Sequence, residues 1–285
     1  MTDPQPDRRR GPAEVRLTDE TISYLEQRIA SAVGTGLKSA MTEDTAAAFW
    51  AAGLSVLQKQ ATQHAGRFVL GGLLDVVTDS RFAANRTIYF CYAEPGEGGR
   101  GNSTALARAR LSDDRRRLED VKVLFRQQPK VASSLHFGCR IVEARDGTLL
   151  LALGERYHRM QDAQRLDNHH GKVVRLNKDG SVPRDNPFVG RAGALPEIWS
   201  YGHRNPQGAT LAPDGTYWLH EHGPQGGDEI NLPKPGLNYG WPVITHGENY
   251  GGGPIGAGIT ARDGMEQPLH HWTPSIAPSG MAFLT

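Results

Sequence analysis

Hydrophobic positions change from a helical to a strand-like spacing near residue 65. In the first part, apolar residues such as Ile22, Leu25 and Ile29 recur every three or four positions, which is the spacing of one helix face. Two glycines interrupt this stripe, and a second stripe of the same kind follows it. We therefore predict an α-helical hairpin across roughly 18–64, within an N-terminal segment that covers residues 1–65.

Beyond residue 65 four similar segments recur. They are GLLDVV at Gly72, GCRIVEARDGTLLLALG at Gly138, GATLAPDGTYWLHEHG at Gly208 and GMAFL at Gly280, with spacings of 66, 70 and 72 residues. In the middle two, Asp-Gly separates two apolar runs and indicates a hairpin, because both residues tolerate a positive φ. One hairpin per regular repeat predicts an all-β domain over 66–285, and radial repetition favours a β-propeller over the alternative, a β-sandwich.

Composition supports many short strands and excludes some functions. Gly and Pro number 34 and 18 among 285 residues, which is more than usual and indicates many turns. The formal net charge of +1 does not indicate a nucleic-acid binder or a polybasic membrane binder. The two cysteines, Cys91 and Cys139, are too few for a disulfide framework, and we expect them to be buried free thiols.

The N-terminus carries no export signal that the sequence reveals. Its first residues, MTDPQPDRRRGP, are polar and charged and lead into no apolar stretch. The longest apolar run, Ala46 to Leu57, has 12 residues, whereas a membrane-spanning helix needs ~20. We expect no transmembrane segment, and a cytoplasmic location for the chain as written.

One stretch, HEHGPQGGDEINLPKPGLNYGWP from His220 to Pro242, combines several groups that could bind ions. A Gly-Pro break turns backbone carbonyls outward, and two adjacent carboxylates, Asp228 and Glu229, follow a pair of glycines. A carboxylate with nearby carbonyls suits a hard cation such as calcium. A solvated acidic turn is the simpler alternative.

A zinc site is a second alternative for the same stretch. His220 and His222 would share one face of a strand, and a third imidazole is available from His169, His170 or His246. The chain contains no close-spaced zinc motif such as HExxH.

Two further clusters carry polar groups suited to catalysis. In EIWSYGHRNPQG, from Glu197 to Gly208, Arg204 stands beside an amide, and the pair would suit an anionic oxygen. In SSLHFGCR, His136 stands just before a repeat, where the loops of a propeller gather near its axis, and an imidazole there can transfer protons near neutral pH. A surface loop and a structural histidine are the corresponding alternatives.

Taken in order, the segments HFGCR, GHRNPQG, EHGPQGGDEINL, NYGWP and PSGMAF, together with DGSVPRDNPF, resemble the glucose/sorbosone dehydrogenase family. The resemblance covers roughly Gly71 to Thr285. It implies a six-bladed β-propeller that binds pyrroloquinoline quinone (PQQ) and calcium. It also implies oxidation of aldose sugars to lactones by hydride transfer to the quinone.

The resemblance also assigns roles to individual residues. It implies that His136 is the catalytic base for the anomeric hydroxyl of the sugar, and that Arg204 stabilises negative charge on the quinone oxygen. The remaining matches are cofactor-side positions and positions linked to calcium: Asn205, His222 and Asp228 for the cofactor, Gly223 and Pro224 for the catalytic calcium, and Glu229 and Tyr239 for additional calcium.

Several positions depart from the family pattern. Leu70 stands where members usually have Gln, and Cys139 stands where Gly is more typical, so that it would crowd its strand. His222 stands where some members have Gln. The first and last blades are not recognisable, nor is the export signal of this largely periplasmic family.

These departures leave a second functional class open. The chain would then be a truncated, catalytically inactive relative that binds cofactor weakly or serves in association, a homodimer being one assembly that its helical segment allows. The sequence does not identify the sugar or the electron acceptor.

Overall fold

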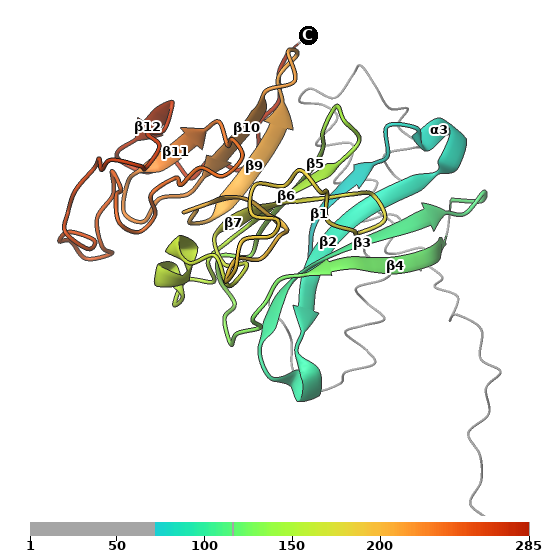
Figure 1. Ribbon diagram of the computed structural model, residues 1–285, viewed down its shortest axis with the longest axis horizontal. Helices are drawn as coiled ribbons and strands as arrows, with labels where there is room; N and C mark the ends of the chain where they lie inside the picture. The colour runs from blue at the N-terminus through green and yellow to red at the C-terminus, as the bar shows by residue number, and fades with distance from the viewer. Residues whose placement is uncertain (1–71, 116, 285) are drawn as a thin grey trace, which may run out of the picture.

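Three antiparallel β-sheets make up the part of the chain that the structure describes, residues 72–115 and 117–284 of a computed structural model (Figure 1). Each sheet has four strands, and each strand pairs with the next along the chain. The domain is therefore mostly β, and its sheets are built as the blades of a partial propeller. The predicted helical hairpin at 18–64 and the boundary at residue 65 lie outside the described residues.

The first sheet contains β1 (Leu73–Thr78), β2 (Thr87–Pro95), β3 (Asn102–Leu111) and β4 (Leu118–Arg126), with the short helix α3 (Phe82–Asn85) after β1 and a 3₁₀ turn, η1 (Glu97–Gly99), after β2. The second contains β5 (Gly138–Glu143), β6 (Leu149–Leu153), β7 (Lys172–Leu176) and β8 (Ile198–Tyr201), with the 3₁₀ turn η2 (Met160–Gln164) after β6. The third contains β9 (Pro206–Leu211), β10 (Tyr217–Glu221), β11 (Asp228–Asn231) and β12 (His270–Trp272). None of the helices among these residues is long and apolar enough to cross a bilayer.

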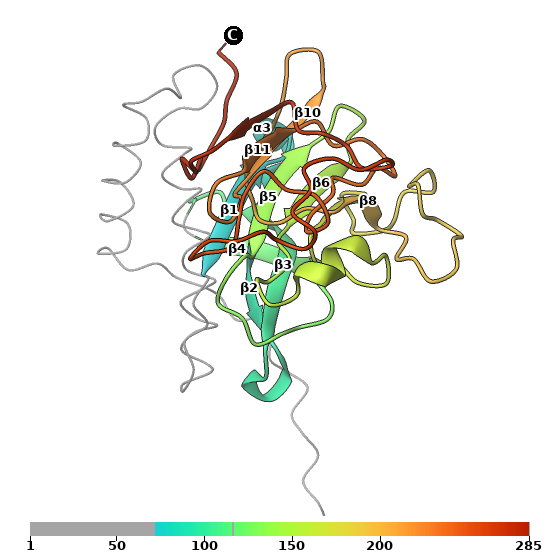
Figure 2. The same ribbon diagram turned by 90° about the vertical axis from the view of Figure 1, so that its left-hand side faces the viewer.

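The repeats predicted from the sequence correspond to the first strands of the sheets. Strands β1, β5 and β9 lie side by side, so that the second sheet stands between the other two. Viewed after a 90° turn, the sheets overlap one behind another (Figure 2). The two predicted Asp-Gly hairpins are confirmed, since Gly147 and Gly215 have φ of +81° and +92° in the turns after β5 and β9.

The fourth predicted repeat does not form a strand. Residues 280–284 have no regular structure, and Phe283 instead packs edge-on against Trp218 of β10 with ring centroids 5.3 Å apart. A strand is stable only when a neighbouring strand satisfies its backbone groups. No strand within residues 72–284 pairs with this segment, so that its apolar pattern does not produce one.

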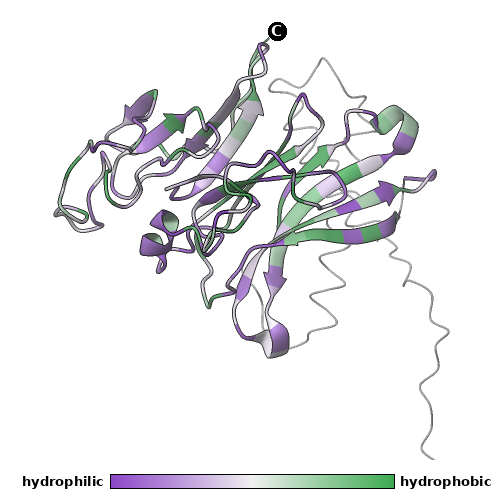
Figure 3. Ribbon diagram, in the orientation of Figure 1, coloured by the Kyte–Doolittle hydropathy of each residue, from purple (hydrophilic) through white to green (hydrophobic). Residues whose placement is uncertain are grey.

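Successive side chains along a strand point to opposite faces of its sheet, and those on facing sheets pack together into hydrophobic cores. Tyr89 and Cys91 of β2 face the second sheet, where they join Leu149 and Leu151 of β6 in one buried cluster. The intervening Leu150 faces the third sheet and packs in another cluster. Strand β6 is apolar at every position because both of its faces are covered, and the strands of the first sheet are also largely hydrophobic (Figure 3).

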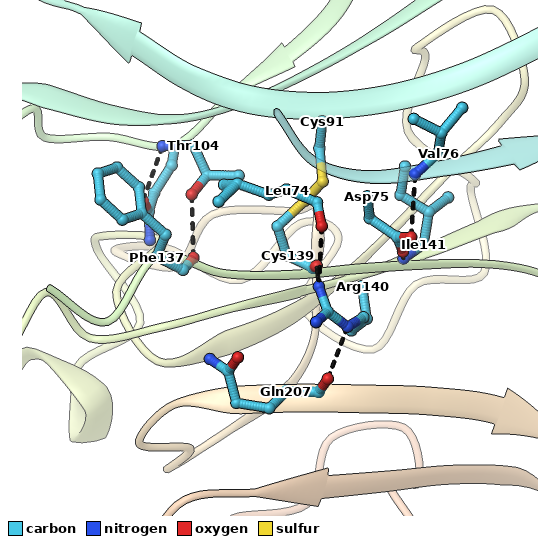
Figure 4. The surroundings of a disulfide bond; sticks show 11 residues. Leu74, Asp75, Val76, Cys91, Thr104, Phe137, Cys139, Arg140, Ile141 and Gln207 are labelled. Carbon is cyan, nitrogen blue, oxygen red and sulfur yellow. Dashed lines mark hydrogen bonds between the residues drawn. A yellow bond between two sulfur atoms is a disulfide. The ribbon is translucent and has the colours of Figure 1, made fainter. Parts of the chain in front are cut away.

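The expectation of two free thiols is wrong, because Cys91 of β2 and Cys139 of β5 form a disulfide that joins the first and second sheets (Figure 4). The two Cα atoms are 6.5 Å apart, which is within bonding reach, although 48 positions separate the residues in the sequence. Cys139 lies in a β-bulge and has a φ of +74°. This backbone conformation favours glycine, so that cysteine is strained where glycine would not be.

A second link joins all three first strands. Arg140, the neighbour of Cys139, donates from Nη1 to the carbonyl of Leu74 in β1 at 3.1 Å (Figure 4). Its Nε donates to the carbonyl of Gln207 in β9 at 2.6 Å. One guanidinium group on β5 therefore connects β1 and β9.

Candidate functional site

A cavity of about 630 Å³ opens where the starts of β5 and β9 meet the loop after β10. Six of the nine site residues predicted from the sequence line it: His136, Arg204, Asn205, His222, Gly223 and Pro224. The far wall comes from the β11–β12 connection and from residues 273–277, which the sequence had not indicated. The volume is that of a small-molecule site.

The backbone at His136 turns its ring toward a buried carboxylate. His136 has a φ of +48°, and its Nδ1 lies 3.1 Å from Oε1 of Glu155, a residue that is 1% exposed. Gly154 makes this approach possible, because a Cβ there would lie 2.1 Å from the carbonyl oxygen of His136. Burial lowers the pKa of His136, although the charge and hydrogen bond of Glu155 oppose that shift. Burial therefore favours the neutral imidazole, the form that can accept a proton.

Glu155 also connects His136 to Arg204. Its main-chain N–H donates to the Arg204 carbonyl at 3.0 Å, while its side chain holds His136. The sequence interpretation missed Glu155. A signal was present, since a glycine and a charged residue follow directly after the apolar run of β6, at the same end of the hairpin as His136.

Arg204 crosses the cavity wall toward the loop after β10. Its Nη1 donates to the carbonyls of His222 and Gly223 at 2.9 and 2.5 Å, and its guanidinium lies 5.2 Å from the centre of the Trp241 ring. Its main-chain N–H donates to Oε2 of Glu221 at 2.5 Å. Among the described residues, the buried Nε has no hydrogen-bond partner. The side chain thus places a positive charge at the cavity wall.

Asn205 and His222 lie beside Arg204 on the same wall. The main-chain N–H of His222 donates to the Asn205 carbonyl at 3.1 Å. His222 Nε2 donates to the carbonyl of Pro278 at 2.7 Å, which holds the final segment against the wall. Asn205, His222 and Arg204 therefore contribute to one wall of the cavity.

Asp228 lies behind the wall and does not line the cavity. Its Oδ1 accepts the N–H of Gly223, and its Oδ2 accepts the hydroxyl of Ser275 and the N–H groups of Ile276 and Ala277, all at 2.7 to 2.9 Å. Burial raises its pKa, but these hydrogen bonds outweigh burial and lower the pKa below its ordinary value. Asp228 therefore ties two segments of the wall together.

Glu229 and Tyr239 belong to a separate buried polar cluster. Glu229 lies opposite Glu221 on the paired strands β10 and β11, and Asn231 donates to both carboxylates at 3.0 and 3.1 Å. Burial and the charge of Glu221 raise the pKa of Glu229 to about 8. Tyr239 stacks on His203, which in turn bonds Glu221 at 2.9 Å.

The histidines considered for zinc do not converge. His220 is 2% exposed and packs against Gly208, whereas His222 lines the cavity. His170 bonds Asp162 and Pro129, and His246 stacks on His271. Within residues 72–115 and 117–284, no group of three or more His, Cys, Asp or Glu side chains is placed to hold a metal ion.

The cavity wall suits a quinone cofactor better than it suits a cation. The positive charge of Arg204, with the Asn205 amide and the His222 imidazole also in the lining, matches an oxygen-rich, anionic group such as PQQ. Gly223 and Pro224 present backbone that could ligate calcium, but the Gly223 carbonyl already accepts a hydrogen bond from the positively charged Arg204. Calcium binding here stays a prediction.

Comparison with known proteins shows the family of the chain. The model of the Glucose / Sorbosone dehydrogenase family matches residues 58–285. The chain belongs to the glucose/sorbosone dehydrogenase family. It is 50% identical over 217 residues to the aldose sugar dehydrogenase YliI of Escherichia coli (strain K12), covering 75% of this chain and 57% of that protein.

Solved structures of family members show the same arrangement of sheets. The soluble aldose sugar dehydrogenase from Escherichia coli in the apo-form superposes with a TM-score of 0.71 at 47% identity, over 74% of this chain and 61% of that one. The PQQ-bound form of aldose sugar dehydrogenase from Streptomyces coelicolor gives a TM-score of 0.60 at 26% identity, over 76% of this chain and 59% of that one. The chain thus spans about three fifths of the length of these relatives.

Proposed function

We propose that this chain oxidises an aldose at its anomeric carbon to the lactone, with PQQ as the electron acceptor on a propeller of the six-bladed type. The observation that carries the proposal is that His136 and Arg204 line one cavity and are joined by Glu155. The family relationship supports the reaction class, and a PQQ-bound relative supports the cofactor.

His136 would act as the base. Its Nδ1 is engaged by Glu155, so that Nε2 is the nitrogen that accepts the proton of the anomeric hydroxyl. The Glu155 carboxylate would fix this tautomer and stabilise the imidazolium that results. The C1 hydride leaves as the C1–O1 double bond of the lactone forms, and PQQ, when bound, supplies the quinone that accepts this hydride.

Arg204, Asn205 and His222 would hold the cofactor. Arg204 is itself largely buried, and its charge there stabilises negative charge on an oxygen more strongly than it would in water. Calcium at Gly223 and Pro224, and at Glu229 and Tyr239, is a further part of the proposal that no step above requires.

Reconstitution tests the proposal. Purified chain would receive PQQ with and without calcium, and glucose-dependent reduction of an artificial dye would be followed. We expect turnover that His136→Asn abolishes, since Asn tolerates the left-handed backbone that His136 adopts. His270→Ala is the matched control, because His270 is an exposed histidine that does not line the cavity. PQQ binding without turnover would instead favour the cofactor-binding alternative.

The disulfide supports a proposal about location. A buried disulfide between Cys91 and Cys139 forms and persists where thiols are oxidised, and such bonds are rare in a reducing cytosol. We place maturation of the chain in an oxidising compartment, in place of the cytoplasmic expectation. Alkylation of free thiols in intact cells before lysis tests this, and two alkylated cysteines in the folded chain would contradict it.

A further inference from the structure

Directly after the buried Glu155, the chain bends through two left-handed residues. Arg156 and Tyr157 have φ of +68° and +65°. Bulky side chains rarely adopt this conformation, and where they do, the surrounding structure must enforce it. Glycine would occupy the same turn without strain. The presence of tyrosine therefore calls for an explanation other than the turn itself.

Two buried anchors hold this turn in place. The carboxylate of Glu155 accepts the main-chain N–H of Tyr157 with one oxygen and holds His136 with the other. Arg156 is 0% exposed, lies 3.5 Å from the centre of the Phe137 ring, and donates to Asn102 and to the carbonyl of Ser133. The anchors fix the backbone on both sides of the segment that contains His136.

The turn presents the Tyr157 ring beside the candidate base. The ring centroid lies 5.2 Å from that of His136, with an angle of 82° between the planes, and the side chain is 37% exposed although Glu155 and Arg156 are buried. His158 supports Tyr157 edge-on at 4.9 Å. Tyr157 is not among the residues that line the cavity, but its ring is partly exposed and adjacent to the base, so that a substrate bound at His136 can reach it.

We propose that Tyr157 is a specificity-determining residue whose ring packs against the C–H groups of a pyranose while the anomeric hydroxyl meets His136. The electron-rich face of an aromatic ring attracts the weakly positive C–H groups of a sugar, and contact with the ring excludes water from them. This inference rests on the proposed function, because it assigns to Tyr157 the sugar that His136 would deprotonate. It predicts that the site takes cyclic aldoses and binds open-chain polyols poorly.

Two variants distinguish the effect of losing the Tyr157 ring from an effect on folding. Tyr157→Gly removes the ring and suits the left-handed backbone, so that folding is not impaired, whereas Tyr157→Phe keeps the ring. We expect Tyr157→Gly to raise the KM for glucose by about tenfold with kcat changed less than about threefold, and Tyr157→Phe to resemble the parent chain. An unchanged KM in Tyr157→Gly would overturn the proposal. A loss of kcat alone would also overturn it, because the ring would then serve only to position His136.

A second readout does not depend on turnover. Saturation-transfer NMR would follow 1,5-anhydroglucitol, a pyranose without the anomeric hydroxyl, on the chain with PQQ added, with sorbitol as the open-chain comparison. We expect its C–H signals on the parent chain and Tyr157→Phe, and their loss on Tyr157→Gly. If the parent chain shows no turnover but binds the pyranose in this way, the proposed function fails while the role of Tyr157 stands. No binding to the parent chain, or equal binding to Tyr157→Gly, would refute the role.

Discussion

Nδ1 of His136 lies 3.1 Å from Oε1 of Glu155, at the open end of the β5–β6 hairpin. Gly138 pairs with Leu153 across that hairpin, so that the residues just beyond each strand meet. The register of the β5–β6 pair therefore places the Glu155 carboxylate within hydrogen-bonding distance of the His136 imidazole.

The Glu155 carboxylate is expected to orient His136 through this hydrogen bond. In Glu155→Gln the charge that stabilises an imidazolium is lost, and we expect kcat to fall by about 10- to 100-fold with little change in KM. Steady-state kinetics of the reconstituted chain would measure this. Glu119→Gln is the control, because Glu119 is a carboxylate on the edge strand β4 that does not line the cavity. Equal kcat values for parent and Glu155→Gln would show that the contact has no catalytic role.

Activity should persist at a lower pH than a free imidazole would allow. Burial lowers the pKa of His136 below the ordinary value of 6.5, and only the neutral ring accepts a proton. The acid limb of kcat/KM should therefore lie below pH 6.5 and move lower still in Glu155→Gln, because Glu155 raises this pKa. The pH profiles of the two proteins check the prediction, which an acid limb above pH 6.5 would contradict.

Removing Asp228 should open the cavity wall. Asp228→Ala leaves three N–H groups and one hydroxyl without their acceptor, and we expect a loss of about 3 kcal/mol in the free energy of unfolding. PQQ binding should weaken in parallel. Urea unfolding and cofactor titration measure the two effects, with the exposed Asp263→Ala as the control. Stability equal to that of the control would refute the role of Asp228 as a tie.

Asp79 should make stability depend on pH in strong acid. Burial raises its pKa, but Lys178, Asn85, Tyr89 and the Arg81 N–H outweigh that effect and hold the pKa at about 2, below the ordinary value of 3.8. This stabilisation, about 2 kcal/mol, is complete above about pH 4 and disappears as the pH falls through about 2. Asp79→Asn should flatten that dependence, and unfolding curves at several acidic pH values would show it.

Cys139 offers a test of the strained bulge. Both Cys139→Ala and Cys139→Gly remove the disulfide, which closes a long loop and is worth about 4 kcal/mol. Only glycine suits a φ of +74°, so that Cys139→Gly should be the more stable of the two. Thermal unfolding under identical conditions compares them. A more stable Cys139→Ala would show that the bulge relaxes once the bond is removed.

Most of the correct predictions about the fold came from patterns that extend over only a few neighbouring residues. Asp-Gly turns and alternating side chains act over a few residues, and they located the hairpins that follow β5 and β9. The segment at Gly280 has the same local pattern, but a strand also needs a neighbour, which no local pattern specifies.

The sequence predicted the site residues that lie within recognisable motifs. His136 and Arg204 stood out as polar groups suited to catalysis, the resemblance to a known family assigned their roles, and both line the cavity. Glu155 was missed because its contact with His136 depends on strand register. The Cys91–Cys139 bond was missed because it depends on how two sheets pack. The placement of Asp228 behind the wall could not be read from its neighbours in sequence.

The link that Arg140 makes between the three sheets restricts the residue type at position 140 but not at the two positions that it binds. It binds the main-chain oxygens of Leu74 and Gln207, and every residue type offers such an oxygen. Side chains at positions 74 and 207 are thus free to change without loss of these bonds, whereas few replacements at position 140 could reach both oxygens. Of the three residues that make this link between the sheets, position 140 alone must keep its side chain.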